Sequence, residues 1–409
     1  MSSRAIIILS WKNVWRNPVR SGIVILSVVV ATWSGIFMVG FFNGMTVQFV
    51  RDQLQNYTSH IQIHDTRYVD ENLPEYTIRD ADQIINSLKS FDFVTQVTPR
   101  TVINGLISSA NNNFGVTIEG VQPNLEIQTT AIHSYLIEGE YLKGTLRNPV
   151  YIGSDLAQKL SVQLRSRIVL TFQDTQGNIT AGAFRVEGIF KTPNKAFNEG
   201  NILVRAEDLN RLLGDENAVH EIIIMVDDYV QSENYTQQIQ SVLTDSVIVR
   251  SWKDVSPMLK YIESSMDISM YLVMVILIIA LCFGIINTML MAVLERTAEL
   301  GMLRAVGLNK IRSFSMIMLE TTFLTMIGSP VGLFLGWIFN TWYGVHGIDL
   351  AFFSQGLELY GFNSMIYPEL GLSYYLNITI LMLLATIFSA TFPALKALRL
   401  NPVEAIRKQ

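Results

Sequence analysis

Charged side chains are absent from four long stretches of the chain, and this pattern predicts how the chain crosses a membrane. The four stretches without Asp, Glu, Lys or Arg are 21–50, 268–294, 321–348 and 370–395. A helix needs roughly 20 apolar residues to span the hydrocarbon core of a bilayer, and each stretch is longer than that. A simple soluble enzyme is therefore excluded. The predicted transmembrane helices are 21–50, 268–294, 314–345 and 372–398.

The interval 51–267 has the composition of a water-soluble domain and lies between the first two predicted transmembrane helices. Strict alternation of apolar and polar residues predicts a strand at 59–64. Further strand-like stretches are 114–119, 150–152, 167–172, 183–190, 201–204, 221–226 and 246–250. Helices are predicted at 80–90, 154–160, 206–213 and 231–243, with Ser154 as an N-cap. Strands interleaved with a few helices predict an α+β domain, with a β-rich insert at about 115–200.

The first 20 residues predict an amphipathic helix lying on the cytoplasmic surface of the membrane. Trp11 and Trp15 are one helical turn apart, and basic residues lie between the apolar ones, a pattern typical of helices in the headgroup region. Pro18 is expected to end this helix before the chain enters the bilayer. The apolar run that follows exceeds the roughly 7–15 residues of a cleaved signal peptide, so an uncleaved anchor is expected.

Composition and charge predict how the chain is oriented across the membrane. Of 409 residues, 16% are charged, and the interval 51–267 holds 18 basic against 28 acidic residues. The N-terminus, the 295–313 link and the C-terminus carry four basic residues each. Because short basic segments stay in the cytoplasm, we expect both termini, with the 399–409 tail, and the link inside. The large domain and the 346–371 loop are then outside, in the periplasm. The acidic domain gives no electrostatic support for nucleic-acid binding.

Two segments carry the most specific patterns. The link reads Leu294-Glu-Arg-Thr-Ala-Glu-Leu-Gly-Met-Leu-Arg-Ala-Val-Gly-Leu-Asn309, and the C-terminus contains Phe392-Pro-Ala-Leu-Lys-Ala-Leu-Arg-Leu-Asn-Pro-Val-Glu-Ala-Ile406. Both resemble signatures of the FtsX/MacB-type (type VII) permeases of ABC transporters, the first through E-R-x-x-E-[IL]-G-x-x-[RK]-A-[VI]-G. The strand around His60–His64 with Tyr68, and the stretches Ile118-Glu-Gly and Val186-Glu-Gly-Ile, are similar to the lipoprotein-releasing branch, LolC and LolE.

This resemblance implies a fold and a set of partners. The fold is four transmembrane helices with a MacB-like periplasmic core domain between the first two, in the inner membrane. The partners are a second permease chain, identical or sister, and two cytoplasmic ATPase subunits that hold Mg-ATP, so the permease itself is non-catalytic and holds no cofactor. ATP binding would move the periplasmic domains by mechanotransmission, releasing a lipoprotein from the surrounding membrane lipids to a periplasmic carrier.

The cytoplasmic link is the candidate for coupling to an ATPase. The sequence contains no G-x-x-x-x-G-K-[ST] phosphate loop, so ATP hydrolysis by that route requires a partner. The link is short, charged with both signs and continuous with a predicted transmembrane helix, as a docking handle requires. Alternatively, its charges only mark the membrane edge and set the topology. The candidate coupling residues are Glu295, Arg296, Glu299, Gly301, Arg304, Ala305 and Gly307.

The third transmembrane helix contains two unusual features. Gly328, Gly332 and Gly336 recur every four residues, a spacing that lets two helices bring their backbones together. Packing within the helix bundle is the expected role, with a dimerisation face as the alternative. Glu320 is an acid among apolar residues, which makes it a candidate for a proton relay. Its position about two turns from Arg312 favours an interfacial or packing role instead.

Methionine and aromatic residues are concentrated toward the outer ends of the first two transmembrane helices. Such flexible apolar side chains suit acyl chains or varied hydrophobic cargo, although packing or lipid-facing residues would look the same. The candidate cargo contacts are Phe37, Met38, Phe41, Met45, Met266, Met270 and Met274.

The segment 191–199 joins two predicted strands and is polar and basic, with one aromatic expected to be exposed. By resemblance to the lipoprotein-releasing branch, it is the candidate contact for a periplasmic carrier, with an ordinary hairpin as the alternative. Its candidate residues are Lys191, Pro193, Lys195 and Phe197. His60 and His64 lie on one strand face, where we expect a solvated surface rather than a metal site.

Two other functions remain open. One is an FtsX-like mechanotransmitter that regulates a periplasmic cell-wall hydrolase or signalling partner and moves no cargo. The other is MacB-like efflux of peptides or drugs. The efflux reading is disfavoured because MacB carries a fused ATPase, whereas about 20 residues precede the first transmembrane helix in this sequence.

Overall fold

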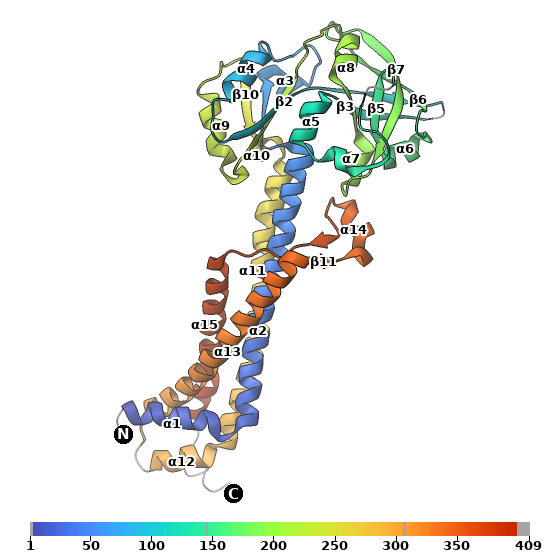
Figure 1. Cartoon of the computed structure of the whole chain (residues 1–409). Coiled ribbons are helices and arrows are strands. Elements are labelled where there is room, and N and C mark those ends of the chain that lie inside the picture. The colour runs from blue at the N-terminus through green and yellow to red at the C-terminus, as the bar shows by residue number, and fades with distance from the viewer. Residues whose placement is uncertain (1–2, 111, 144–145, 306–307, 399–409) are drawn as a thin grey trace. The chain divides into compact units, whose positions relative to one another are not determined.

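The computed structural model describes residues 3–110, 112–143, 146–305 and 308–398. These residues form two compact units, shown by element in Figure 1. The membrane unit comprises Met1–Val47, Ser264–Asp349 and Met365–Gln409, and the outer unit comprises Gln48–Glu263 and Leu350–Ser364.

Four helices in the described part of the chain are long and apolar enough to cross a membrane. They are α2 (Pro18–Gln53), α11 (Pro257–Glu295), α13 (Lys310–His346) and α15 (Leu372–Leu398). The outer unit follows α2 in the chain and precedes most of α11. The predicted architecture, four transmembrane helices with a large α+β domain between the first two, is therefore confirmed. The remaining elements of the membrane unit are α1 (Ser3–Arg16), α12 (Thr297–Ala305), β11 (Ile348–Asp349) and β12 (Met365–Ile366).

Helix α1 packs along α13 and ends at Arg16, before Pro18, as predicted. Pro18 is the first residue of α2 rather than only the end of the preceding helix, because proline lacks an N–H that would be unpaired there anyway. Ser10 Oγ of α1 donates to the carbonyl oxygen of Met316 at 3.2 Å. Trp11 lies edge-on to Phe323 of α13, yet Trp11 and Trp15 are still about half exposed, so α1 keeps a partly exposed apolar face.

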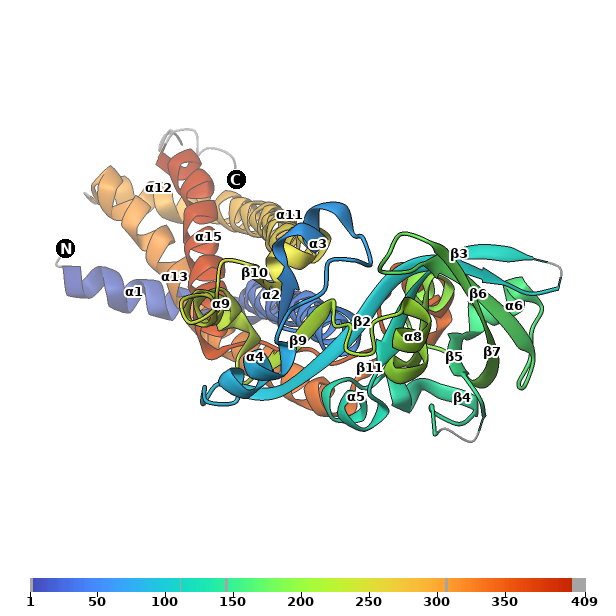
Figure 2. The same cartoon turned by 90° about the horizontal axis from the view of Figure 1, so that it is seen from above.

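The outer unit is built on a ten-stranded mixed sheet, seen from above in Figure 2. Its strands run in the order β10-β1-β9-β2-β3-β8-β5-β7-β4, and β6 pairs with β2 and β7. The strands are β1 (Ile61–Asp65), β2 (Val94–Ser108), β3 (Asn113–Val121), β4 (Leu136–Gly139), β5 (Pro149–Gly153), β6 (Arg167–Gln173), β7 (Ile179–Phe190), β8 (Asn201–Arg205), β9 (Glu221–Val226) and β10 (Val247–Ser251).

Helices cover this sheet and include several that the sequence analysis did not predict. The observed helical elements are η1 (Leu54–Thr58), α3 (Thr66–Glu71), α4 (Ala81–Leu88), α5 (Pro123–Thr129), η2 (Ile132–Tyr135), α6 (Ser154–Leu160), α7 (Lys195–Gly200), α8 (Ala206–Leu213), η3 (Tyr229–Gln231), α9 (Ser232–Gln240), α10 (Trp252–Val255), η4 (Ala351–Phe353) and α14 (Ser354–Leu359). The N-cap of α6 is Gly153, so the predicted cap at Ser154 was wrong by one position.

Every predicted strand overlaps an observed one, but the longest strand, β2, was missed. Pro99 lies in its middle, and a proline within an apolar run argues against a strand. Residues Val94 to Arg100 of β2 pair with β9, whereas Thr101 to Ser108 pair with β3. Each half of β2 belongs to a different hydrophobic cluster, one around Ile222 and the other around Ile118. Arg100 therefore marks the junction between two cores of the outer unit.

Candidate functional site

The link between α11 and α13 contains a short helix, α12, separated from α11 by a break at Arg296. Glu295 is the last residue of α11, and Gly301 is buried within α12. Of the other candidate coupling residues, Arg304 and Ala305 belong to α12 by backbone, but their side chains and the whole of Gly307 lie outside the described residues. Among the described side chains of α12, Met302 is 54% exposed, which leaves an apolar residue available to a partner.

Three arginines and three glutamates form an ion-pair network around this link. Its members are Arg16 of α1, Arg20 of α2, Glu295 of α11, Arg296 of the break, Glu299 of α12 and Glu320 of α13. No sequence pattern connects these residues, because they are up to 304 positions apart, from Arg16 to Glu320. They come together only when five helices pack at one end of the membrane unit.

Arg296 lies at the centre of the ion-pair network. Its Nη1 donates to Glu320 Oε1 at 2.9 Å, and its Nε donates to Glu299 Oε2 at 3.3 Å. Glu299 also accepts a hydrogen bond from Arg16, and this bond, followed by the one from Arg296, lowers the pKa of the Glu299 carboxyl. Arg20 lies 3.9 Å from Glu320. One guanidinium therefore contacts both α12 and α13.

The network is buried at one end and open at the other. The side chain of Glu320 is 6% exposed and that of Arg296 14% exposed, against 50% for Glu295. Beside them lies a cavity of about 240 Å³ lined by Asn13, Arg16, Asn17, Arg20, Glu295, Arg296 and Glu299. The position of Glu320 next to two arginines fits an interfacial packing role better than a proton relay.

The glycines of α13 lie directly against α2. A Cβ placed on Gly332 would be 2.7 Å from the Cβ of Thr32 and 2.8 Å from the Val29 carbonyl oxygen. Gly328 and Gly336 approach Val28 and Ile36 as closely, in the same register. One turn further, Asn340 Nδ2 donates to the Ile36 carbonyl oxygen at 3.2 Å. The structure thus places the three glycines at a parallel backbone contact within the chain.

The structure does not gather the candidate cargo residues on one exposed surface. Met270 and Met274 are buried in the hydrophobic cluster of the membrane unit. Met274 lies near Gly35 together with Met382 of α15. Phe37 instead packs toward α13, with its ring centroid 6.2 Å from that of Tyr343. The other candidates, Met38, Phe41, Met45 and Met266, are half-buried.

The candidate carrier segment is partly helical, and its aromatic residue is not exposed. Phe197 is 8% exposed and packs against Tyr57, with ring centroids 4.3 Å apart. The expectation of an exposed aromatic was therefore wrong, since α7 turns Phe197 toward the core. Lys191 and Lys195 are exposed and Pro193 is half-buried, so the two lysines are the available contacts.

His64 of β1 is not on a solvated face, contrary to the expectation, and His60, one residue before β1, is half-buried. His64 is 5% exposed, and its Nε2 lies 2.9 Å from Gln62 Oε1. Burial lowers its pKa to about 4. In the described part of the chain, no group of three or more His, Cys, Asp or Glu is arranged to hold a metal ion.

A buried charged cluster and a large cavity in the outer unit were not predicted at all. Arg100 is 3% exposed, and its guanidinium is paired with Glu119, Glu126 and Glu221. These four residues form the Arg100 cluster. Burial raises the pKa of Glu119 and that of Glu221 to about 7. No sequence pattern marks the cluster, because its members come from β2, β3, α5 and β9.

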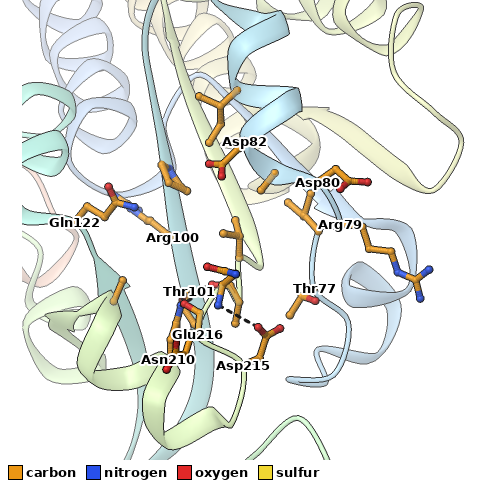
Figure 3. Close-up of a pocket in the computed structure, with 18 of the residues that line it drawn as sticks. Thr77, Arg79, Asp80, Asp82, Arg100, Thr101, Gln122, Asn210, Asp215 and Glu216 are labelled. Carbon is orange, nitrogen blue, oxygen red and sulfur yellow. Dashed lines mark hydrogen bonds between the residues drawn. The ribbon is translucent and has the colours of Figure 1, made fainter.

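The cavity beside Arg100 has a volume of about 670 Å³ (Figure 3). Thr77, Asp80 and Asp82 reach it from the start of α4, and Asn210 reaches it from α8. Acidic and basic side chains both line it, and Thr101 Oγ1 donates to Asn210 Oδ1 at 2.8 Å on its wall. The cavity is polar and does not define a ligand by its chemistry.

Two family models match the chain. The model of the FtsX-like permease C-terminal matches residues 271–402, and that of the MacB-like periplasmic core domain matches residues 21–242. The four membrane helices and the large domain define a multi-pass membrane protein of the ABC permease class. The chain belongs to the FtsX/MacB-type (type VII) family of ABC transporter permeases, as its motifs predicted.

The curated relatives include MacB and LolC proteins. A macrolide export ATP-binding/permease protein MacB of Campylobacter fetus subsp. fetus is 25% identical over 348 residues, or 79% of this chain. The lipoprotein-releasing system transmembrane protein LolC of Neisseria meningitidis serogroup B is 23% identical over 395 residues, covering 91% of this chain and 90% of LolC. The chain spans 48% of the MacB relative's length and 65% of an ABC transporter permease of Methanocaldococcus jannaschii.

Among solved structures, the periplasmic region of MacB from Actinobacillus actinomycetemcomitans is similar, with 13% identity and a TM-score of 0.35. The match covers 52% of this chain and 98% of that chain.

Proposed function

We propose that this chain is the permease subunit of an ABC complex that extracts a lipoprotein or another hydrophobic cargo from the outer leaflet of the cytoplasmic membrane. A partner subunit hydrolyses Mg-ATP on the cytoplasmic side, and a second permease chain completes the membrane part. The outer unit lies in the periplasm, and both termini lie in the cytoplasm. Similarity to LolC along nine-tenths of the chain supports the lipoprotein cargo.

This proposal rests on the way in which α12 is held by its neighbours. It is a short helix between two membrane helices, and Glu299 on it is held by Arg16 of α1 and Arg296 of the break. Because Glu299 is paired with both arginines, a partner that displaces α12 is expected to displace α1 and the break at Arg296 as well. The exposed Met302 offers that partner an apolar contact.

Co-purification tests the proposal. Tagged full-length chain expressed in its native host should recover an ATPase, and Met302→Asp should lower the recovered ATPase at least tenfold, because a charge opposes burial of that position. Val242→Asp is the matched control, since Val242 is 59% exposed in the outer unit. A chain that purifies as a stable protein without any ATPase would refute the proposal.

Crosslinking from the outer unit separates the cargo function from its alternatives. A photo-reactive residue at Lys191 or Lys195, both exposed, should capture a lipoprotein carrier if the proposal is right. Capture of a cell-wall hydrolase or a sensor kinase would instead support an FtsX-like regulator. Capture of an outer-membrane channel component would support MacB-like efflux.

A further inference from the structure

We propose that Arg296 and Glu320 form the joint through which movement of α12 is passed to α13. This inference rests on the proposed docking of an ATPase at α12. It assigns a positioning role to a buried acid that the coupling motif does not contain.

Arg296 stands where such a joint is needed. It occupies the break between α11 and α12, and its backbone N–H donates to the Val293 carbonyl oxygen at 3.3 Å, which continues the last turn of α11. From this place its guanidinium contacts Glu299 on one side and Glu320 on the other. The planar fork of arginine lets one side chain hold two carboxylates at fixed angles, as lysine does not.

Burial makes the contact with Glu320 stiff. The two side chains are 6% and 14% exposed, so water does not compete effectively for their charges. Separating a buried pair leaves an unpaired charge in a medium of low dielectric, which is strongly unfavourable. A displacement of α12 is therefore expected to carry Glu320 with it. The pair between Arg16 and Glu299 is more exposed, at 56% and 37%, and yields more easily.

The next contacts carry the movement along α13 and onto α2. Glu320 is also 3.9 Å from Arg20 near the start of α2. Farther along, Gly332 brings the α13 backbone against Thr32 and Val29. Because Gly332 has no side chain that could deform, we expect the two helices to move together. Helix α2 continues in the chain as far as Gln53, within the outer unit.

The test uses the complete complex in nanodiscs, with nitroxide labels at Val242 and Leu372, which are 59% and 76% exposed. Cys282 is replaced by Ser so that the labels are unique. Trapping the ATPase with ADP and vanadate should shift the distance between the labels in the parent protein. Glu320→Gln keeps the size of the side chain but removes its charge. It should reduce that shift at least fivefold, while ATPase recovery stays within twofold.

Two further variants make the result specific. Glu207→Gln removes an acid outside the ion-pair network, one whose side chain is 68% exposed and 3.5 Å from Arg205 in the outer unit, so the shift should persist. Arg296→Lys should give an intermediate shift, because one ammonium group does not reproduce both contacts. Melting temperatures within a few degrees of the parent would show that each variant is folded.

The outcomes also separate this inference from the proposed function. If the parent complex recovers the ATPase and shows the shift, but Glu320→Gln shifts as much as Glu207→Gln does, the joint is refuted and the docking stands. If the parent recovers no ATPase, the proposed function fails. A double-mutant cycle on the thermal stability of the isolated chain then tests the pair, and no coupling between Arg296→Gln and Glu320→Gln would refute it.

Discussion

The Nη1 atom of Arg100 lies 3.5 Å from Oε2 of Glu119 and 3.9 Å from Oε1 of Glu221, while Nε donates to Glu126 at 3.2 Å. One buried positive charge thus faces three buried carboxyl groups. The cluster sits where β2 leaves β9 and begins to pair with β3. The ionisation of its acids therefore bears on the contact between the two cores of the outer unit.

The Arg100 cluster predicts a dependence of stability on pH. Burial raises the pKa of Glu221 from 4.5 to about 7, so the folded chain holds this proton more tightly than the unfolded chain does. The free energy of unfolding should then fall as pH rises from about 4.5 to 7 and level off above. In Glu221→Gln this contribution is absent, and the variant should gain about 1–3 kcal/mol relative to the parent between pH 5 and pH 8.

Thermal unfolding of both chains in detergent across this pH range measures that difference. His64, whose burial lowers its pKa to about 4, makes stability rise with pH up to about 6.5, but it is present in both chains and cancels. If the stability of the parent and that of the variant changed in parallel with pH, the prediction would be contradicted.

The contact between α13 and α2 predicts that a single methyl group is destabilising. In Gly332→Ala the new Cβ would approach Thr32 and the Val29 carbonyl oxygen at 2.7 and 2.8 Å, so the helices must separate. A loss of about 1–3 kcal/mol is expected, seen as a lower melting temperature in detergent. Gly284→Ala in α11 is the matched control, because no described atom beyond the adjacent residues and backbone of its own helix lies within 4 Å of its added methyl group. Equal melting temperatures for the two variants would rule out the close contact.

Phe197 is predicted to be a structural residue rather than a carrier contact. Its ring packs between Tyr57 and Phe190, so Phe197→Ala should cost about 3–5 kcal/mol of stability through the cavity it leaves. Lys195→Ala should leave the melting temperature unchanged and weaken crosslinking to a periplasmic partner. If Phe197→Ala melts like the parent while crosslinking is lost, the aromatic ring itself is the contact.

The exposed face of α1 is predicted to lie in the lipid headgroup region. Trp11 and Trp15 are 44% and 53% exposed, and tryptophan prefers the membrane interface. The test uses variants that retain only Trp11 or only Trp15, reconstituted with brominated lipids. Bromine near the headgroup should quench the tryptophan fluorescence strongly, and bromine at the end of the acyl chain should quench it weakly. Uniform weak quenching at all depths would place these residues in water or against protein.

The sequence alone determined the number and order of the membrane helices, because burial in lipid leaves long stretches without charge. Four stretches without charge predicted α2, α11, α13 and α15, and α15 has the predicted bounds of 372–398. Strand-like stretches predicted eight of the ten strands of the sheet. The short strand β4 was also missed, since four residues carry too little alternation to be distinguished from a loop.

The tertiary structure decided how distant residues meet. The four-residue spacing of Gly328, Gly332 and Gly336 suggested a packing face, but only the fold shows that α2 covers it. Glu320 was visible as an isolated acid, and the fold supplied Arg296 and Arg20 as its partners. Ion pairs and close helix contacts join positions that are distant in sequence, so no local sequence pattern predicts them. Their energy comes from burial, which exists only once the helices have packed.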